Sequence, residues 1–543
     1  MAAEERLNSW KEIARYLRCS VRTVRRWERH EGLPVHRHMH RTLARVFALK
    51  CEVDAWRSAL TRPPRRPTRR PDAPHAALTI AVLPFGNLGA ETDEEYFADG
   101  LTEEITTTLA RIRSLRVTSC RSAQTFRGRA TATRTIASQL GVRYLLAGSV
   151  RRAGARLRIS AQLIDAASDT HLWADSYDGE VEDVFAMQER LARVIVASLS
   201  LRLAPGEERG LTERGIGSLP AYECYLRARH ESWRWRPDAI DRAVRLLEEA
   251  LRLIGPNVKL YGALGLAHLQ RREAGIDYSE RPLHEADECA RRLFALDPAC
   301  APGLLLRGWL SYARGQVQEA VRDLERSRAL EPDNADTLLL LSNCYLISGR
   351  IEAARPLLAH LAALDPLTPI TRCMPAWADI LEGEFARAVG PYGEMFTLDP
   401  ANPMARLFYA WVLLLAGQPD ESRALVEDFP PDARDGVPAR IARFLVLMHD
   451  GVAAEAQALL PPATQAAAAE SEVFARLLAQ GYAGAGLAEP ALRWLRIAVD
   501  RGFINHTFLT RHDPAFARLR HTADFATLAA EVRARWQGFE VPT

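Results

Sequence analysis

Several features that would point to particular classes of protein are rare in this sequence or absent from it. The 543 residues contain only eight cysteines, and no two of them form a C-x-x-C pair. This argues against a disulfide framework or a cysteine zinc site and predicts reduced thiols, as in a cytoplasmic protein. No window approaches 18 apolar residues and no apolar signal peptide opens the chain, so we expect no membrane partner.

Sequence motifs of nucleotide-dependent and hydrolytic enzymes are also missing. The chain has no G-x-x-x-x-G-K-[ST] loop, no kinase H-R-D or D-F-G set and no H-E-x-x-H. The nearest approach to a carboxylate cluster is Asp99, Glu103 and Glu104. No base, nucleophile or metal-ligand histidine accompanies them at a recognisable spacing, so we interpret them as a solvated helix face or a structural cap. The sequence therefore predicts a protein that is not an enzyme and holds no cofactor or metal.

Charge is distributed unevenly, although the net charge is only +3. Residues 1–75 contain 18 Lys and Arg against 8 Asp and Glu, which leaves the rest of the chain acidic. A basic segment on an acidic body favours an anionic partner for that segment, most simply nucleic acid.

Residues 7–60 have the pattern of a small DNA-binding domain. Ser9 and Glu12 form an S-x-x-E capping box that opens a first helix. Ser20 is a suitable cap for a second helix over about 21–30. The outer stripe of that helix carries Arg22, Arg25, Arg26 and Arg29. Two short helices, the second faced with arginine, are typical of a helix-turn-helix whose second helix enters the major groove.

Two short strands, Val35–Met39 and Thr42–Leu49, and a third helix with Val53 inward are expected next. This order resembles the winged-helix domains of the MerR and excisionase families, mainly through WKEIARYLRCSVRTVRRWE (Trp10–Glu28) and RVFALKCEVDAW (Arg45–Trp56). The resemblance implies binding of double-stranded DNA, with the hairpin as a wing on the backbone or minor groove. The candidate DNA-contacting residues are Arg22, Thr23, Arg25, Arg26, Arg29, Arg37, His38 and Arg41. His36, His38 and His40 alternate, but without a carboxylate or cysteine at ligand spacing we interpret them as wing residues near phosphates.

A basic, proline-rich stretch over residues 61–76 predicts an extended tether. Residues 77–205 then alternate strand and helix signals, including an antiparallel hairpin of Tyr144–Val150 and Arg156–Ile164, and predict an α/β layer domain. This segment resembles the TolB-like domain through VLPFGNL, YFADGLTEEI, AGSVRRAGARLRISAQLIDA and LWADSYDG. The resemblance implies a place between a DNA-binding or signalling head and a repeat array, and it says little about mechanism.

Glycine and proline recur every 34 residues in the second half of the chain. The positions are Gly315, Gly349, Gly383, Gly417 and Gly451, with Pro298, Pro332, Pro366 and Pro400. That period, with small Ala320, Ala354 and Ala388 where helices approach, is similar to tetratricopeptide repeats. The resemblance implies an all-α solenoid of six to eight units over 219–505, whose inner groove takes a protein or peptide. Residues 506–543, including a helix over Asp513–Trp536, are expected to cap its end.

These observations predict a multidomain chain: a small winged helix-turn-helix, an α/β TolB-like domain and an all-α tetratricopeptide solenoid. We interpret it as a cytoplasmic one-component transcription regulator that binds double-stranded DNA, and homodimer formation on a two-fold site is left open. Two alternatives remain. One is a tetratricopeptide scaffold without specific DNA binding, and the other is an accessory protein of a nucleotide-signalling enzyme.

Overall fold

A computed structural model divides the chain into two compact units, Met1–Ala76 and Ala77–Thr543. It describes residues 6–17, 20, 21, 23, 24, 33–40, 43–50, 53, 78–89, 95–212, 215–232, 236–273, 277–431 and 433–542. The predicted tether over 61–76 lies outside the described residues, as does the predicted third helix apart from Val53.

The first unit contains a short helix and a small antiparallel sheet. The elements are β1 (Arg6–Leu7), α1 (Trp10–Leu17), β2 (His36–His40) and β3 (Leu43–Leu49), and the strand order is β1-β3-β2. The predicted hairpin is confirmed, with His36 opposite Phe47 and His40 opposite Leu43. Strand β1 was not expected, because a two-residue strand carries no alternation to detect. A small core holds the unit together and includes Ile13, Ala14, Val24, Leu33, Ala48 and Val53, all buried.

The second unit begins with a mixed sheet. Its strands are β4 (Leu78–Val82), β5 (Gly86–Asn87), β6 (Leu115–Val117), β7 (Tyr144–Ala153), β8 (Arg156–Asp165) and β9 (Thr170–Glu180). The order is β6-β4-β7-β8-β9, with β5 paired to β7; β4 runs parallel to both of its neighbours, whereas β7, β8 and β9 are antiparallel. The predicted hairpin is therefore confirmed. Strand β9 was not expected, because ten of its eleven residues are at least partly exposed.

Helices cover both faces of this sheet. They are α4 (Glu95–Ala110), α5 (Cys120–Gln124), α6 (Thr133–Leu140), the 3-10 turn Val181–Asp183, α7 (Val184–Ser198) and α8 (Pro205–Thr212). Because side chains alternate along a strand, Ile80 and Val82 join the core with α4 and α7, whereas Ala81 joins a separate cluster with α6. The result is an α/β domain with a sheet between helical layers.

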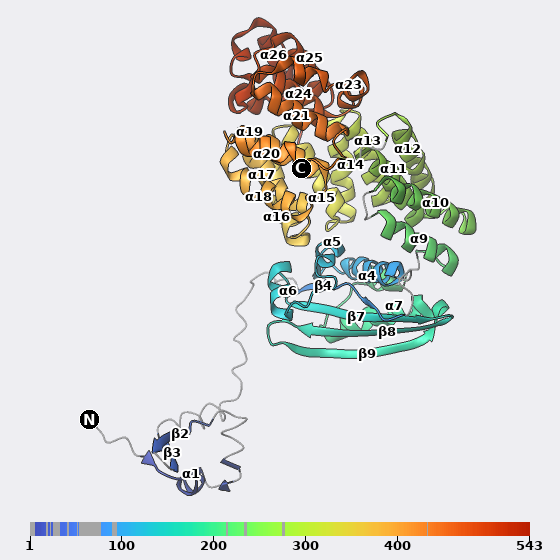
Figure 1. Ribbon diagram of the computed structural model, residues 1–543. Coiled ribbons are helices and arrows are strands. Elements are labelled where there is room, and N and C mark those ends of the chain that lie inside the picture. Colours follow the sequence, from blue (N-terminus) through green and yellow to red (C-terminus); the bar gives the residue numbers. More distant parts are fainter. Residues whose placement is uncertain are drawn as a thin grey trace. The chain divides into compact units, whose positions relative to one another are not determined.

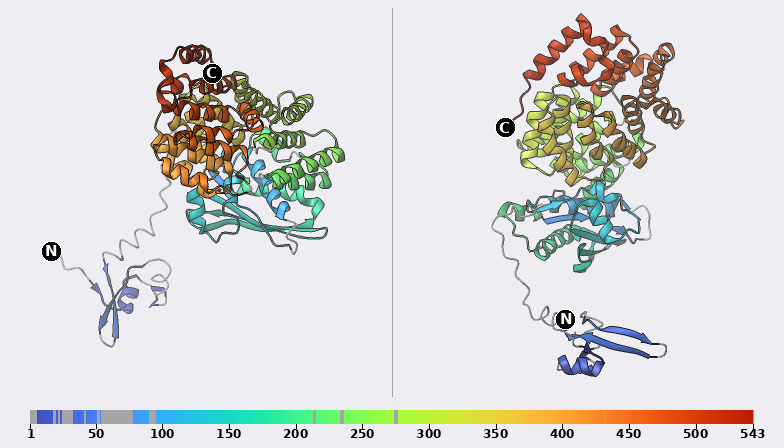
Figure 2. Two further views of the ribbon diagram at one scale, coloured as in Figure 1. Left: turned by 45° about the horizontal axis from the view of Figure 1, so that its top comes forward. Right: turned by 90° about the vertical axis from the view of Figure 1, so that its left-hand side faces the viewer.

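Paired helices make up the rest of the unit and follow one another in chain order (Figures 1 and 2). Their bounds are α9 (Leu219–Ser232), α10 (Pro237–Ile254), α11 (Val258–Glu273), α12 (Arg281–Leu296), α13 (Ala301–Ala313), α14 (Val317–Leu330), α15 (Ala335–Ile347), α16 (Ile351–Leu364), α17 (Pro369–Leu381), α18 (Phe385–Leu398), α19 (Pro403–Leu415), α20 (Pro419–Glu427), α21 (Val437–His449), α22 (Ala453–Ala458), α23 (Pro462–Ala469), α24 (Glu472–Gly484), α25 (Ala488–Asp500) and α26 (Ala523–Gln537). The prediction of an all-α repeat region is confirmed.

The 34-residue rhythm has the predicted physical basis. Gly315 lies in the tight turn between α13 and α14 with φ of 77°, a left-handed conformation that resists other residues, and Gly383 has φ of 88°. Ala320, Ala354 and Ala388 are fully buried where helices approach one another. Each glycine therefore permits a turn, and each alanine permits close packing.

The C-terminal segment differs from the expected continuous helix. Only α26 within Asp513–Trp536 is an α-helix, and it is preceded by short turns at Phe508–His512, Pro514–Phe516 and Leu519–His521. The helix cannot start earlier because the Asp513 and Thr522 side chains both accept backbone N–H groups and so begin new elements.

Candidate functional site

The first unit supplies the backbone of the predicted DNA-binding head. Ser20 Oγ accepts the Thr23 N–H at 3.1 Å, so the expected cap is present, and Thr23 is partly buried. Ser9 Oγ accepts the Glu12 N–H at 3.2 Å, while the Glu12 carboxylate accepts the N–H of Asn8. The Glu12 side chain therefore accepts from the residue before Ser9, whereas in the usual capping box it accepts from the N–H of the cap residue itself.

Most of the predicted DNA-contacting side chains cannot be placed. Arg37 and His38 lie on β2, and only their backbone is described. The remaining arginines fall outside the described residues: Arg22, Arg25, Arg26, Arg29 and Arg41. Their contact with DNA therefore stays a prediction.

An aromatic contact fixes the base of the predicted wing. The rings of His36 and Phe47 stack with centroids 5.1 Å apart, and the Arg6 guanidinium lies 3.5 Å from the Phe47 ring centroid. The described part of the wing therefore begins at a packed cross-strand pair, with a cation over the same ring.

The carboxylates on α4 are not the solvated face that the sequence suggested. Asp99 and Glu104 are buried, at 4% and 9% exposure. Asp99 pairs with Arg127 and with His230 Nδ1 at 2.9 Å, and Glu104 pairs with Lys259 Nζ at 2.5 Å. Burial of charge requires partners, and here these come largely from helices α9 and α11, beyond the reach of local periodicity.

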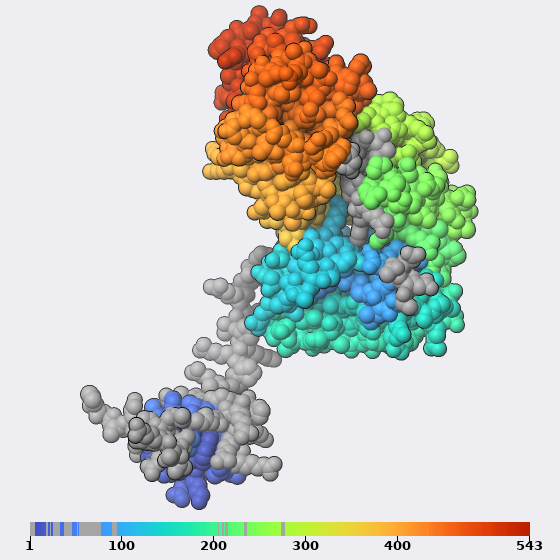
Figure 3. Space-filling model, in the orientation of Figure 1, coloured from blue at the N-terminus to red at the C-terminus, as the bar shows by residue number. Residues whose placement is uncertain are grey.

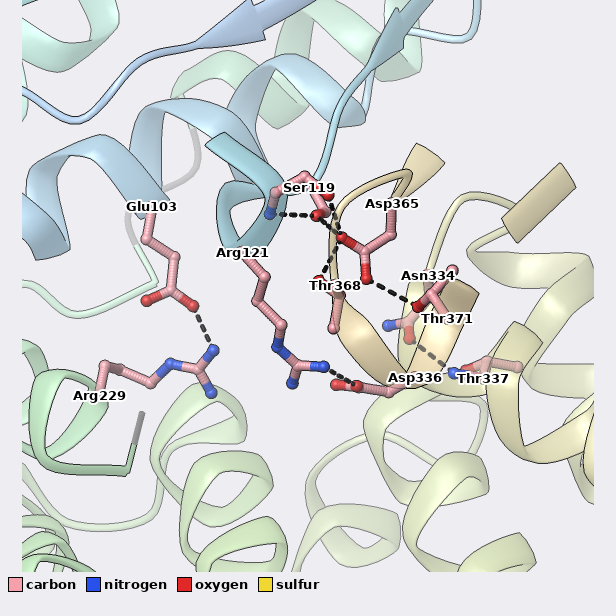
Figure 4. A network of polar contacts seen from close by, with 11 residues as sticks. Glu103, Ser119, Arg121, Arg229, Asn334, Asp336, Thr337, Asp365, Thr368 and Thr371 are labelled. Carbon is pink, nitrogen blue, oxygen red and sulfur yellow. Dashed lines mark hydrogen bonds and ion pairs between the residues drawn. The ribbon is translucent and has the colours of Figure 1, made fainter. Parts of the chain in front are cut away.

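Helix α4 thereby attaches the α/β domain to the first repeat helices, and we call this the α4 contact. Glu103 pairs with Arg229 of α9, as Figure 4 shows. Gly100 lies so close to α9 that a Cβ there would collide with the Leu226 side chain. One continuous hydrophobic core runs from the sheet through α4 and α9 as far as Leu310. The α4 contact therefore combines a continuous apolar core with buried or half-buried ion pairs.

A second contact, the α5 contact, joins the same domain to a later part of the array (Figure 4). Ser119 donates to Asp365 Oδ1, and Ser122 Oγ donates to the same oxygen at 2.6 Å. Thr368 and Thr371 donate to Asp365 at 2.7 and 3.0 Å, so this carboxylate, 1% exposed, accepts four hydroxyl groups.

Backbone groups and one ion pair complete the α5 contact. The Ser119 N–H donates to Leu364 O at 2.7 Å, and the Leu367 N–H donates to Ser122 Oγ at 2.9 Å. Arg121 pairs with Asp336 at 3.0 Å. In the space-filling view the cyan surface of the α/β domain meets the yellow part of the array (Figure 3). The contact is small, polar and formed by residues about 240 positions apart.

Comparison among repeats shows that the array is specialised at this point. Leucine occupies the same repeat position at Leu296, Leu330, Leu364 and Leu398. The exposed fractions are 44%, 51% and 52% at the first, second and fourth of these positions, but 2% at Leu364. The acidic residues that follow are exposed in the other three repeats, whereas Asp365 is buried. The repeat ending at Pro366 is therefore modified to hold the α/β domain.

The helix cap changes in the same repeat. Asn334 and Asn402 cap the first helices of the flanking repeats by accepting their N–H groups. Thr368, at the equivalent position, makes no such cap, and its hydroxyl donates to Asp365 instead. In this repeat the residue at the cap position supports the carboxylate that Ser119 and Ser122 contact.

Part of the array's inner surface is covered by the chain itself. Arg476 of α24 lies 4.8 Å from the ring centroid of Trp377 on α17 and 5.1 Å from that of Trp411 on α19. Its side chain is 3% exposed and pairs with Glu472 at 2.9 Å. At this place the first helices of the hairpins are not open to a peptide.

The C-terminal residues also cover the turns of earlier repeats. Ile504 N–H donates to Ile347 O at 3.1 Å, and Arg350 donates to Phe539 O at 2.9 Å. Residues 504–539 therefore fold back over the turn at Gly349, rather than only covering the last hairpin as the sequence suggested.

Within the described part of the chain, no group of three or more His, Cys, Asp or Glu side chains could hold a metal ion. No helix among those residues has both the length and the apolar character needed to cross a bilayer.

Burial raises the pKa of the Cys120, Cys344 and Cys373 thiols, which makes them poor nucleophiles.

Two families match parts of the second unit. Residues 311–370 and 379–445 match the tetratricopeptide repeat, and residues 76–194 match the HilA/YgeH-like transcriptional regulator, second domain. The chain thus carries tetratricopeptide-like repeats behind a regulator-like α/β domain, a combination that fits a regulator with a protein-interaction region. The MerR-like and TolB-like resemblances stay predictions.

Individual relatives match smaller parts. A Rhizobium meliloti (strain 1021) protein named "Putative adenylate cyclase 3" is 39% identical over 191 residues, which are 35% of this chain and 32% of the relative. The chain therefore spans about a third of that relative's length.

Solved structures resemble the array more weakly. A thermophilic repeat protein of Thermus thermophilus is 21% identical, with a TM-score of 0.29 over 34% of this chain and 97% of that one. A tetratricopeptide repeat protein of Parabacteroides merdae ATCC 43184 is 14% identical, with a TM-score of 0.31 over 51% of this chain and 99% of that one. Neither likeness carries a functional argument.

The α5 contact was not predicted from the sequence. Its signal was visible only as a departure from the repeat pattern, in LDPLTPIT, where Thr368 replaces the Asn found at 334 and 402. Nothing in the sequence indicated that Ser119 and Ser122 were the partners, because α5 has only five residues.

Proposed function

We propose that this protein is a DNA-binding one-component transcription regulator. The observation that carries the proposal is the match of residues 76–194 to the second domain of a HilA/YgeH-like transcriptional regulator, directly behind a basic N-terminal unit. A domain of that class placed after a basic head favours DNA as the partner of the head.

In this proposal the head is a winged helix-turn-helix of MerR or excisionase type. The second helix presents Arg22, Thr23, Arg25, Arg26 and Arg29 to the major groove, where arginine pairs with guanine or grips phosphate. Arg37, His38 and Arg41 on the hairpin contact the backbone or minor groove. Two heads of a homodimer read a two-fold site.

In this proposal the second unit senses or recruits a protein partner. Its α/β domain, which we interpret as TolB-like, and its repeats bind a protein partner, and this binding alters the pairing or placement of the heads. Since Arg476 and residues 504–539 cover part of the array, we place the partner on repeat surfaces outside those contacts. The protein acts in the cytoplasm and is not itself an enzyme.

Fluorescence anisotropy of the full chain with genomic fragments tests the proposal. We expect binding that weakens steeply with salt, because phosphate contacts release counterions. Replacing Arg22 and Arg26 with alanine should cost about 1–3 kcal/mol for each lost base contact. Arg245→Ala with Arg252→Ala removes equal charge from exposed positions on α10 and should leave affinity unchanged. Absence of binding to every fragment at low salt would reject the regulator.

The two alternatives have separate outcomes in simple assays. Binding lost in moderate salt, without sequence preference, would favour a scaffold whose head meets an acidic protein. The relative named for an adenylate cyclase favours, more weakly, an accessory role in nucleotide signalling. A turnover assay with nucleoside triphosphates, alone and with a cyclase present, would detect that role.

A further inference from the structure

The second unit contains two large hydrophobic cores that meet at helix α13 and at Leu266 of α11. The amino-terminal core runs from Ile80 to Leu310 and includes the sheet, α4 and α9. The carboxyl-terminal core runs from Leu305 to Phe539. Both reach into α13, and Trp309 on that helix packs against each of them. Helix α13, beside Leu266 of α11, is therefore the main apolar junction between two bodies and the place where the chain passes from one to the other.

Away from α13, the contacts between these two bodies are mostly polar. The α5 contact consists of hydroxyl, carboxylate, backbone and guanidinium groups, with Leu364 and Leu367 as apolar members. On another side, Arg272 donates to Glu470 O at 3.0 Å, and the Tyr278 and Phe474 rings meet edge to face. Apolar packing across these areas is limited to single side chains: Leu367 packs against the Ala81 cluster of the α/β domain, and Tyr278 packs against the carboxyl-terminal core.

The chemistry of a contact decides how readily it separates. Opening an apolar interface exposes its surface to water, and the unfavourable free energy grows with the apolar area exposed. Opening a hydrogen-bonded interface exchanges each protein hydrogen bond for one to water, so most of the free energy of each bond is recovered. The α4 contact is of the first kind and the α5 contact is of the second.

We propose that the α5 contact is a releasable latch. The α/β domain stays joined to α9–α13, and release of Asp365 lets this body turn about α13 relative to α14–α26. The burial of Leu364 and Asp365, unlike the exposed residues at the same position in neighbouring repeats, marks where the latch closes. A partner that binds the array can then change the position of the domain to which the head is tethered.

Amide hydrogen exchange of the full chain tests the latch directly. The Ser119 and Leu367 amides donate across the contact, so they are protected only while it is closed. Asp365→Asn keeps the shape of the side chain but removes its charge. We expect about tenfold faster exchange in peptides that span 119–124 and 364–371, with α4 and α9 unchanged.

Matched variants keep the test decisive. Asp399→Asn alters the equivalent, exposed residue of the next repeat and should leave all peptides unchanged. Arg121→Ala breaks a different part of the contact and should speed the same two peptides. If Asp365→Asn and Arg121→Ala both leave amide exchange in the two peptides unchanged, the α5 contact does not hold these segments together, and the latch proposal is wrong. If exchange rises throughout the unit, the contact belongs to the cooperative core and is not releasable. Because the readout needs no DNA, either failure leaves the regulator proposal untouched.

Discussion

The α/β domain touches the repeat array in two places whose chemistry differs. At the α4 contact, Gly100 admits Leu226 and a single hydrophobic core crosses the boundary. At the α5 contact, hydroxyl groups converge on Asp365. The first place fixes the domain to the array, whereas the second specifies where on the array it rests. Directional hydrogen bonds give position, and buried apolar area gives stability.

Truncating the apolar side should have the largest effect. Leu226→Ala leaves a cavity beside Gly100, and we expect a loss of about 2–5 kcal/mol in the free energy of unfolding. Denaturant unfolding of both chains measures this. Leu398→Ala, at a side chain that is 52% exposed, should change stability by less than about 0.5 kcal/mol. Equal losses in the two variants would remove the contrast between the contacts.

Asp513 is a buried carboxylate that lies outside both contacts, so it shows the effect of burying a charge by itself. Burial raises the pKa of Asp513 to about 6, although Gln480 donates to it at 2.7 Å. A carboxyl pKa above its unfolded value of about 3.9 means that the native state binds the proton more tightly, so stability from this residue falls as pH rises from about 4 to 6. Relative to Asp513→Asn, the wild type should lose about 2 kcal/mol over that range. Unfolding curves at several pH values measure it, and a constant difference would contradict the assignment.

Removing one hydroxyl from the α5 contact should have the smallest effect. Ser122→Ala deletes a donor to Asp365 and leaves the Leu367 N–H without its acceptor, at a cost of about 1–3 kcal/mol. Thermal unfolding compares it with Ser138→Ala, an exposed serine on α6 that should be neutral. A loss as large as that of Leu226→Ala would mean that the polar contact also stabilises the core.

Local sequence pattern was sufficient for the repeats and for most of the α/β elements. Glycine and proline at 34-residue spacing report turns and helix ends within a few residues, which is the range over which they act. The hairpin of β7 and β8 was equally readable, since its residues alternate. Local pattern could not predict which residues contact each other when they lie hundreds of positions apart in the sequence. Asp99 resembles any helix carboxylate until Arg127 and His230 are placed beside it.

For the candidate DNA-binding site, the sequence predicts which residues take part but does not predict which bases they contact. Its arginines were found from helical spacing and charge alone, and the described caps at Ser9 and Ser20 agree with the first two predicted helix starts. Charge and periodicity identify a surface, but the target sequence depends on side-chain positions relative to bases. These positions relative to the bases are defined only when the protein is bound to DNA.

The contact between Asp365 and α5 also has a consequence for how this chain can evolve. Solenoids commonly gain or lose whole units, because each unit touches only its neighbours. Here an added hairpin between α9 and α16 would carry the Asp365 turn away from Ser119, and one between α15 and α25 would displace Ile504 from Ile347. Gain or loss of a hairpin in these stretches would therefore break one of the two long-range contacts, a constraint that a solenoid with only neighbour contacts lacks.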